Sequence, residues 1–161
     1  MRWINGEYIR AKSAEELYEL LKKKLLKEKY IDENIDRDYL LKIIQLYKTR
    51  FKTSDEFLRL TECFFKDEYK VDEKGYKKHL SKKESKGLIK KYAEHLKALE
   101  KFDAKNIENI CRKLSEELGI KASKIIHPTR VAISGLTVGA GLFEMMELLG
   151  KEKVIRRLEK V

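Results

Sequence analysis

The segment that decides the fold reads IHPTRVAISG at residues 126–135, LTVGA at 136–140 and GLFE at 141–144. It holds the only proline of the chain, Pro128, and three of the eight glycines lie between Gly135 and Gly141. Glycine reaches positive φ and lets a backbone come close to a ligand. We predict a short helix that begins at Pro128, then a glycine-rich turn, then a helix entered at Gly141. This arrangement would place Arg130 beside free backbone N–H groups.

Most of the remaining sequence shows apolar residues at helical spacing. The pattern S/T-x-x-E, a capping box, predicts helices that begin at Ser13, Thr53 and Ser81, and Asp103 predicts a further helix that Gly119 ends. The Thr53 helix should run to about residue 65, and the Ser81 helix from about 82 to 101. We also expect a helix at about 37–48, short helices up to residue 80, and helices at 141–149 and 151–159.

No stretch alternates like a β-strand, and no repeat is present. We therefore expect an all-α fold of two small stacked helical bundles, with residues 1–62 in the first and residues 63–161 in the second. The first bundle would contain Arg50, on the junction between two helices, and the second would contain Arg130.

The charge of the chain is strongly positive. Its 161 residues include 37 Lys and Arg against 27 Asp and Glu, a net charge of +10, and 42% of them are hydrophobic, enough for a core. This balance favours a polyanionic partner, with nucleic acid ahead of an anionic membrane. The competing interpretation is a general lysine bias, because Lys far outnumbers Arg.

The two cysteines, Cys63 and Cys111, are far apart and form no C-x-x-C pair. Cys111 lies on the apolar stripe of a predicted helix, which is typical of a small buried hydrophobe. With the three histidines scattered, we expect no metal site, and unpaired cysteines fit a reducing, cytoplasmic compartment. No apolar run reaches the about 20 residues of a membrane span, and the first residues, MRWING, lack an apolar leader.

Sequence signatures of catalysis are absent. The chain has no phosphate-binding G-x-x-x-x-G-K-[ST], no G-x-G-x-x-G, no H-E-x-x-H and no nucleophile elbow. Acidic residues alternate with lysines at helical spacing, which is the pattern of a solvent-exposed helix face. We predict no catalytic residue in this chain.

Both ends of the chain carry motifs of a known family. The stretch HPTRVAISG…VGAGLFEMMELLGKEKVIRRLEKV, residues 127–161, resembles the C-terminal end of bacterial-type glutamyl-tRNA synthetases. Their pattern is roughly P-L-R-x-A-L-T-G, a short loop, P-G-L-F-E, L-L-G-K-E-R and a closing R-L. The stretch RWINGEYIR, residues 2–10, resembles the W-x-N-G-x-Y-I-R segment that follows the catalytic half of those enzymes.

The resemblance implies the anticodon-binding region of a class I aminoacyl-tRNA synthetase, a glutamate–tRNA ligase. The H-I-G-H and K-M-S-K-S type motifs of the catalytic half are not in this sequence, so the chain alone should be inactive. ATP and Mg²⁺ would belong to that catalytic half, and no cofactor to this chain. The implied partner is tRNA-Glu, with tRNA-Gln left open as a second one; we expect a cytoplasmic monomer.

The resemblance also assigns site residues. Arg130 matches the arginine of P-L-R-x-A, which lies against the first anticodon base, and Arg50 matches a junctional arginine that faces the third base. The loop that meets the middle base corresponds to Gly139, Ala140, Gly141 and Leu142. The sequence departs from the pattern at Thr129, where Leu is usual, and at Ala140, where Pro is frequent. Any middle-base contact at Gly139 must come from the backbone.

The chemistry at Arg50 gives a hypothesis for specificity. Cytosine presents the O2 and N3 acceptors on its pairing edge, which suit guanidinium donors, whereas guanine presents N–H donors there. A glutamate anticodon ends in C and the commonest glutamine anticodon ends in G, so Arg50 would reject tRNA-Gln. The competing interpretation of a junctional arginine between Lys48 and Lys52 is an exposed solubilising charge.

Two other functions compete with RNA binding. A basic helical adaptor for an acidic protein or a membrane surface would need a large exposed apolar groove or a helix with one apolar and one clean basic face. The sequence shows no such helix. A small enzyme is disfavoured by the absent motifs.

Overall fold

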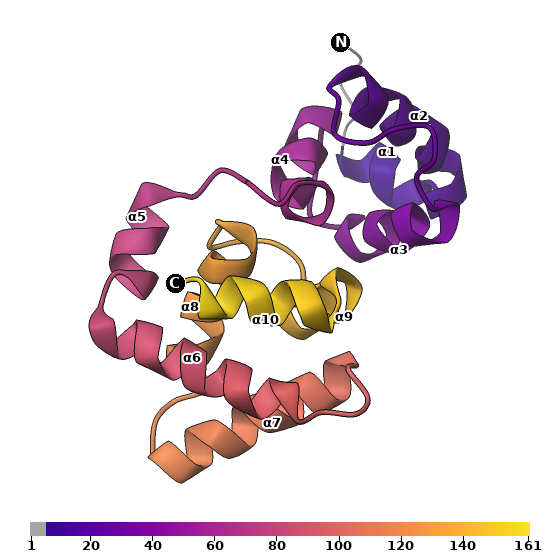
Figure 1. Ribbon diagram of the computed structural model, residues 1–161. Coiled ribbons are helices and arrows are strands. Elements are labelled where there is room, and N and C mark those ends of the chain that lie inside the picture. The colour runs from indigo at the N-terminus through magenta and orange to yellow at the C-terminus, as the bar shows by residue number, and fades with distance from the viewer. Residues whose placement is uncertain (1–5) are drawn as a thin grey trace. The chain divides into compact units, whose positions relative to one another are not determined.

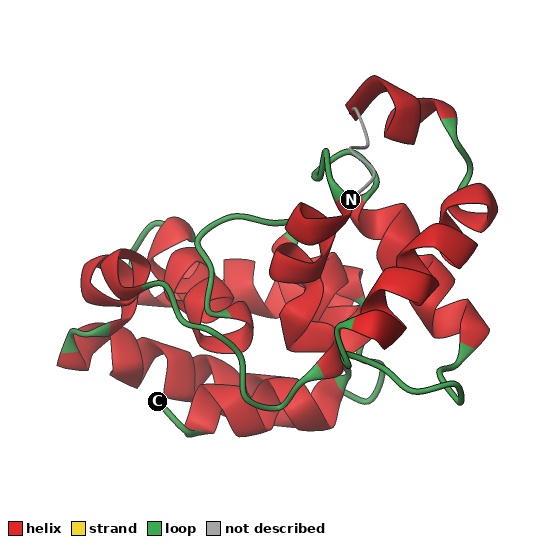
Figure 2. Ribbon diagram, turned by 90° about the horizontal axis from the view of Figure 1, so that it is seen from above, coloured by secondary structure: helices red, strands yellow, loops and turns green. Residues whose placement is uncertain are grey.

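The computed structural model describes residues 6–161, and within that range it contains helices and loops but no strand (Figure 2). The all-α prediction is confirmed. The chain divides into two compact units, Met1–Glu68 and Tyr69–Val161. The division expected between residues 62 and 63 falls inside helix α4, which ends at Phe65. The stretch RWINGEYIR at residues 2–10 lies partly outside the described residues.

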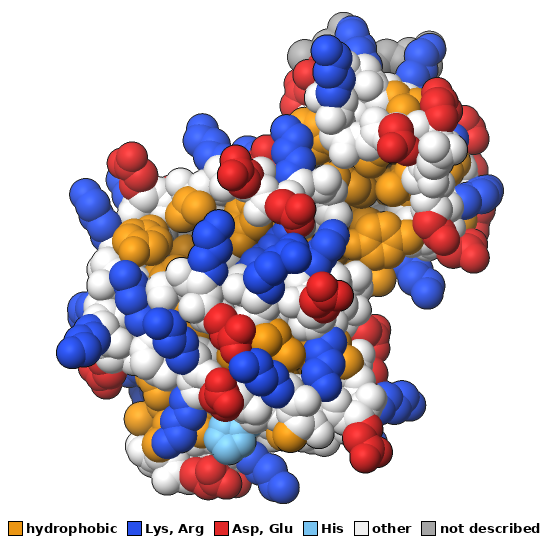
Figure 3. Space-filling view, in the orientation of Figure 1, with side chains coloured by type: hydrophobic (Ala, Val, Ile, Leu, Met, Phe, Trp, Pro, Cys, Tyr) orange, Lys and Arg blue, Asp and Glu red, His pale blue; other side chains and the backbone are white. Residues whose placement is uncertain are grey.

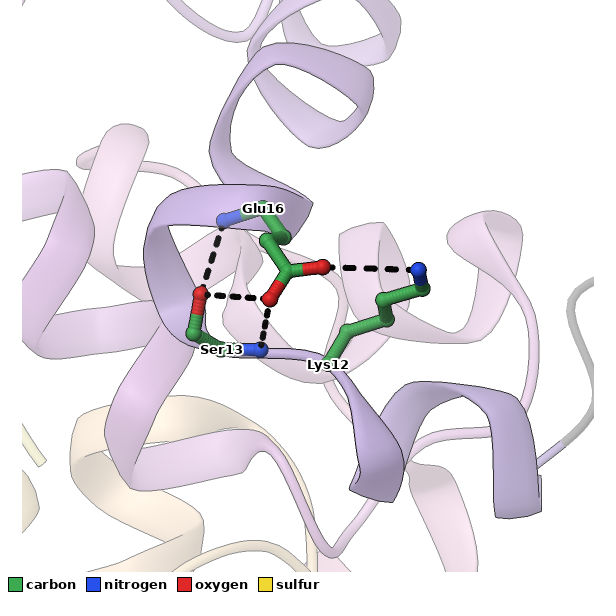
Figure 4. A network of polar contacts seen from close by, with 3 residues as sticks. All are labelled: Lys12, Ser13 and Glu16. Carbon is green, nitrogen blue, oxygen red and sulfur yellow. Dashed lines mark hydrogen bonds and ion pairs between the residues drawn. The ribbon is translucent and has the colours of Figure 1, made fainter.

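The first unit is a bundle of helices (Figure 1), which are α1 (Gly6–Ala11), α2 (Ala14–Lys27), α3 (Arg37–Tyr47) and α4 (Ser54–Phe65). The capping box at the start of α2 is present as predicted (Figure 4): the Glu16 amide donates to Ser13 Oγ, and Glu16 Oε1 accepts from the Ser13 amide. The Ser13 amide, together with Lys12, holds the pKa of Glu16 below its usual value. This satisfies amides that the first helical turn leaves unpaired.

The core of the first unit is formed by the apolar residues that recur at helical spacing in the sequence. Leu17, Leu21 and Leu25 of α2 are buried, while Leu20 is half-buried. The α3 stripe is buried completely, and its residues are Leu40, Ile43, Ile44 and Tyr47. Apolar residues at helical spacing were therefore sufficient to identify the inward faces.

The second unit contains two helices of 15 residues, α6 and α7, with shorter helices beside them (Figure 1). Its elements are α5 (Glu73–Gly75), the π-helix η1 (Tyr76–Leu80), α6 (Lys83–Lys97), α7 (Ala104–Leu118), α8 (Ser123–Ser134), α9 (Leu142–Leu149) and α10 (Lys151–Glu159). The predicted ends of α7 are confirmed: Asp103 accepts from the Asn106 amide, and Gly119 adopts a left-handed conformation with φ 63°. The predicted break between α9 and α10 at Gly150 is confirmed as well.

The prediction that Pro128 begins a helix is wrong, because α8 begins at Ser123 and Pro128 lies inside it. The amides of Ile125 and Ile126 both donate to the Ala122 carbonyl, so the helix is already established before the proline. Proline has the φ of a helix and loses one hydrogen bond to the carbonyl four residues earlier. Pro128 is buried, so packing of its ring offsets part of that cost.

The prediction that Ser81 caps the longest helix is also wrong. The Ser81 hydroxyl donates to the Lys77 carbonyl, at 2.7 Å, and so closes η1. Helix α6 begins at Lys83 without a side-chain cap. The helix ends at Lys97 and not at about residue 101. At this end, Lys151 Nζ donates to the Lys97 and Leu99 carbonyls at 2.8 and 2.7 Å. The local pattern missed the C-terminal end of α6 because its partner, Lys151, is distant in the sequence.

The C-terminal end of α8 is held by side chains from both ends of the second unit. A helix leaves its last carbonyls without partners in the helix. Here the Tyr69 hydroxyl donates to the Ala132 carbonyl at 2.5 Å, and the Arg157 guanidinium donates to the Ile133 carbonyl at 2.7 Å. Arg157 is buried and stacks over the Tyr69 ring, 4.6 Å from its centroid. A cation at this end also complements the helix dipole.

Replacing Arg157 with Met should therefore destabilise the second unit. The change leaves the Ile133 carbonyl buried without its partner and removes the cation–π contact, a loss of about 2–3 kcal/mol in the free energy of unfolding. Urea denaturation followed by circular dichroism measures it. The matched control is Arg156→Met on the exposed side of the same helix, which should change stability by no more than about 0.5 kcal/mol. Equal effects of the two substitutions would contradict this role of Arg157.

Candidate nucleic-acid interface

The loop that joins α8 to α9, residues 135–141, is fixed at its first residue. Gly135 has φ 76°, in the left-handed region, and its carbonyl accepts a hydrogen bond from the Asp72 amide at 2.7 Å. The backbone of Lys70 crosses so close that a side chain at position 135 would collide with the Lys70 carbonyl. Only glycine meets both the φ requirement and the close approach.

The middle of this loop packs against α5 and then reaches solvent. A side chain at Gly75 would meet the Thr137 methyl group, so the α5 backbone braces the loop there. Thr137 and Val138 are exposed, and Val138 keeps 56% of its surface accessible. An apolar side chain at a braced loop tip can pack against a flat ligand such as a base.

Arg130 is held against the far end of the same loop. Its Nη1 donates to the Ala140 carbonyl at 2.7 Å and lies 3.4 Å from Met145 Sδ. The residue is half-buried, and these two contacts fix its guanidinium. A guanidinium carries five N–H donors in a rigid fork, which makes a fixed Arg130 suited to planar acceptors.

The residues predicted to meet a middle base are in part buried. The side chains of Ala140 and Leu142 are only 2% and 3% exposed. Gly139 and Gly141 are half-buried, and the Glu144 carboxylate folds back over Gly141. The loop therefore offers backbone at its glycines and a side chain at Val138. The sequence analysis did not select Val138 as a candidate. Its position between Gly135 and Gly139, in a glycine-rich turn, could have indicated an exposed side chain.

Arg50 belongs to the first unit and lies on the turn between α3 and α4. Its amide donates to the Tyr47 carbonyl at 2.7 Å, and its side chain is exposed. The next residue, Phe51, is buried and packs on Phe57 with ring centroids 4.9 Å apart. Beyond it, Glu56 Oε2 accepts from the Lys52 amide at 2.8 Å. An exposed guanidinium thus stands on a backbone anchored on both sides.

Most of the net charge lies in the second unit. Residues 69–161 contain 22 Lys and Arg against 13 Asp and Glu, a net charge of +9 out of +10 for the whole chain. In the space-filling view, basic side chains spread over the visible face with acidic ones between them (Figure 3). A polyanion would therefore be attracted mainly to the second unit.

Other chemistry is not supported by the described residues. Among residues 6–161, no group of three His, Cys, Asp or Glu is arranged to hold a metal ion. None of the described helices is both long enough and apolar enough to cross a membrane. Cys111 is buried, as expected, and burial raises the pKa of its thiol to about 11, which makes it a poor nucleophile.

Thr129 is a buried polar residue next to Arg130. Its side chain is fully buried, and within the described part of the chain its Oγ1 has no hydrogen-bond partner. A buried hydroxyl without a partner costs free energy relative to an apolar group of the same shape. Thr129 thus weakens α8 without an evident structural gain.

Comparison with known proteins identifies relatives of the chain. A family model described as "Anticodon binding domain" matches residues 16–161. Glutamate–tRNA ligase 1 of Caldanaerobacter subterraneus subsp. tengcongensis is 42% identical over 160 residues, and glutamate–tRNA ligase 2 of Caldicellulosiruptor saccharolyticus is 41% identical. Each match covers 99% of this chain and 33% of the relative, so the chain spans about a third of the length of these curated relatives.

Solved structures agree. The crystal structure of a glutamate tRNA ligase from Elizabethkingia meningosepticum, in complex with its amino acid, superposes with a TM-score of 0.83 at 29% identity. It covers 97% of this chain and 30% of that protein. The glutamate-tRNA synthetase of Elizabethkingia anophelis gives a TM-score of 0.80 at 28% identity, with the same coverage.

Gly135→Ala should destabilise the second unit strongly. The substitution adds a Cβ at positive φ and forces it into the Lys70 carbonyl, at a cost of about 2–4 kcal/mol in the free energy of unfolding. Gly87→Ala is the matched control, because Gly87 lies inside α6 with no atom near its added Cβ. That change should stabilise by about 0.5–1 kcal/mol. Urea denaturation measures both, and a neutral Gly135→Ala would refute the clamp.

Thr129→Val should raise stability. Valine keeps the shape of threonine and removes the buried hydroxyl, so the free energy of unfolding should rise by about 1 kcal/mol. Ser134→Ala on the same helix is the contrasting variant, because its hydroxyl donates to the Arg130 carbonyl at 2.7 Å. Thermal unfolding compares the two, and a loss of stability in Thr129→Val would show that the hydroxyl has a favourable contact.

Proposed function

Because the chain belongs to the anticodon-binding domain family, we propose that it binds the anticodon loop of tRNA-Glu as the C-terminal part of a glutamate–tRNA ligase. The observation that carries the proposal is the arrangement of Arg130, whose guanidinium is fixed on the Ala140 carbonyl beside a braced loop with an exposed tip. A fixed planar donor next to accessible backbone is what the reading of an unpaired base requires.

Arg130 and the loop contact two neighbouring bases of the anticodon, the first and the middle one. Proteins read single-stranded RNA by splaying bases out, stacking them on flat or apolar side chains, and hydrogen-bonding their edges. Arg130 contacts the first anticodon base with its guanidinium. The middle base packs on Val138 and meets backbone groups at Gly139 and Gly141.

Arg50 contacts the third anticodon base. Its side chain is exposed and its backbone lies on an anchored turn, so binding has to order only the Arg50 side chain and not the turn. Cytosine offers the O2 and N3 acceptors to this fork, and guanine offers donors that it repels. Arg50 therefore favours tRNA-Glu over a tRNA-Gln whose anticodon ends in G.

Phosphate contacts supply affinity that does not depend on sequence. Lys and Arg contacts to the RNA backbone set position and register, and base contacts set specificity. The net charge of +9 on residues 69–161 supports a second unit that provides most of these contacts. Binding should weaken as salt rises, with a log–log slope of about 0.7 for each phosphate contacted.

The chemistry of aminoacylation belongs to the rest of the parent enzyme. In our proposal ATP and Mg²⁺ act in its catalytic half, where glutamate is activated and attached to tRNA. Among the described residues of this chain, no group of three His, Cys, Asp or Glu is arranged to hold the metal ion. The chain works as a monomer in the cytoplasm, reads tRNA and does no chemistry.

The test is binding of the chain to an anticodon stem–loop of tRNA-Glu and to the same stem–loop with the last anticodon base changed from C to G. The wild-type chain should prefer the C loop by about tenfold, because one good guanidinium–base pairing contributes about 1–3 kcal/mol of discrimination. Arg50→Ala should reduce this preference to about twofold or less. Fluorescence anisotropy at two salt concentrations measures the affinities.

Arg59→Ala is the matched control for this experiment. Arg59 is an exposed arginine on α4 in the same unit, so its loss removes the same charge. It should weaken binding of both loops equally and keep the C preference. Equal, salt-sensitive binding of both loops by the wild-type chain would leave only a generic basic surface, and an acidic protein partner would then be the better explanation.

A further inference from the structure

Two histidines from distant parts of the sequence form a stacked pair in the second unit. His79 lies on η1 and His127 on α8, and their ring centroids are 5.0 Å apart with an angle of 31° between the planes. η1 packs directly against α8. The π-helix is a rare element that occurs frequently at functional sites. Neither histidine has a role in the base contacts proposed above.

One histidine of the pair, His79, belongs to the lysine-rich segment, residues 70–91. This segment carries nine lysines and three acidic residues, a net charge of +6 within 22 residues. In the space-filling view, basic side chains gather over α5 and the beginning of α6 (Figure 3). The segment is therefore a concentrated positive surface.

The surroundings of His79 oppose a positive charge on its ring. Burial, then His127, then Lys78 hold the pKa of His79 below its ordinary value. The elements packed on η1 carry the following charged or titratable groups: Glu73 and Lys74 on α5; Lys83, Glu84, Lys86, Lys90, Lys91, Tyr92, Glu94, His95 and Lys97 on α6; and Lys124, His127 and Arg130 on α8. No acidic group among them acts to raise the pKa of His79.

We propose that the His79–His127 pair and the lysines around it bind a backbone phosphate of the RNA whose loop is read at Arg130. The proposal rests on the proposed function. His127 precedes Arg130 by about one helical turn of α8. On the other side, Gly75 braces Thr137 of the loop, and η1 follows it directly. The loop and the histidine pair are thus connected through both α5 and α8.

Binding of a phosphate at this pair is coupled to protons. An anion beside the imidazoles favours their charged form and raises their pKa, so RNA binding takes up protons and tightens as the pH falls below about 7. The stability of the chain without RNA changes in the opposite direction: it decreases as the pH falls. Because the pKa of His79 in the folded chain is lowered, the unfolded state binds protons more readily, and the fold loses stability as the pH falls through about 6.5.

The direct test is an NMR titration of the histidine ring protons of the full chain, with and without the anticodon stem–loop. RNA should raise the pKa of His79 and change the ring-proton signals of its stacking partner His127, whereas the signals of His95, which is exposed on α6, should change little. A parallel titration with inorganic phosphate separates free phosphate from RNA. A rise with phosphate and none with RNA would overturn the proposal, and so would no rise with either.

Variants give a second, independent measurement. From about pH 8 to about pH 6, the affinity of the wild-type chain for the stem–loop should rise about threefold or more. The double variant His79→Gln, His127→Gln should lose this rise, and at the lower pH its log–log salt slope should fall by about 0.7, equivalent to one phosphate. His95→Gln is the matched control and should keep both. An unchanged pH dependence in the double variant would refute the proposal.

The same data keep this proposal separate from anticodon reading. The preference for C over G in the third anticodon position depends on Arg50, so it should persist in the double histidine variant. Loss of the pH dependence with the preference intact supports the phosphate site alone. A wild-type chain without any C preference but with the histidine-dependent rise would refute base reading and retain the phosphate site.

Discussion

The hydrogen bond between the Asp72 amide and the Gly135 carbonyl, 2.7 Å long, ties the segment that enters the second unit to the end of α8. It is formed only because Gly135 has no side chain, which lets the backbone of Lys70 pass in close contact. The Tyr69 hydroxyl and the Arg157 guanidinium complete the attachment at the carbonyls of the last turn. The first and last segments of this unit therefore meet on one helix end. The position of the loop that follows depends on that junction.

This junction explains how a short loop can be rigid enough for the RNA reading that we propose. Loops that bind ligands are precise when packed elements support them from several sides. Thr137 rests on α5, and the Ala140 carbonyl accepts from Arg130. The exposed tip at Val138 is the part that remains available. In the proposed function, a few fixed groups carry the specificity, and lysines spread over a unit with a net charge of +9 carry the affinity.

Much of the fold could be predicted from the sequence, because amphipathic stripes and caps at Ser13 and Asp103 act over three or four residues. The errors have one physical origin. Ser81 closes a π-helix, and Pro128 is tolerated inside α8 by a helical turn established before it. In both places the residue has a role other than the one that the capping and proline rules assign to it. In the same way, Arg130 was identified from its motif, whereas the exposure of Val138 and the His79–His127 pair required the tertiary structure.

The central claim is that the loop at residues 135–141 and the turn at Arg50 are the surfaces that contact the anticodon. Backbone amide hydrogen exchange, measured with and without the anticodon stem–loop of tRNA-Glu, tests it most directly. Our account predicts slower exchange at residues 136–141 and 49–52 when RNA is bound, with little change on the exposed face of α7. Slowing that is absent from both segments, or that appears only on other basic surfaces, would contradict it.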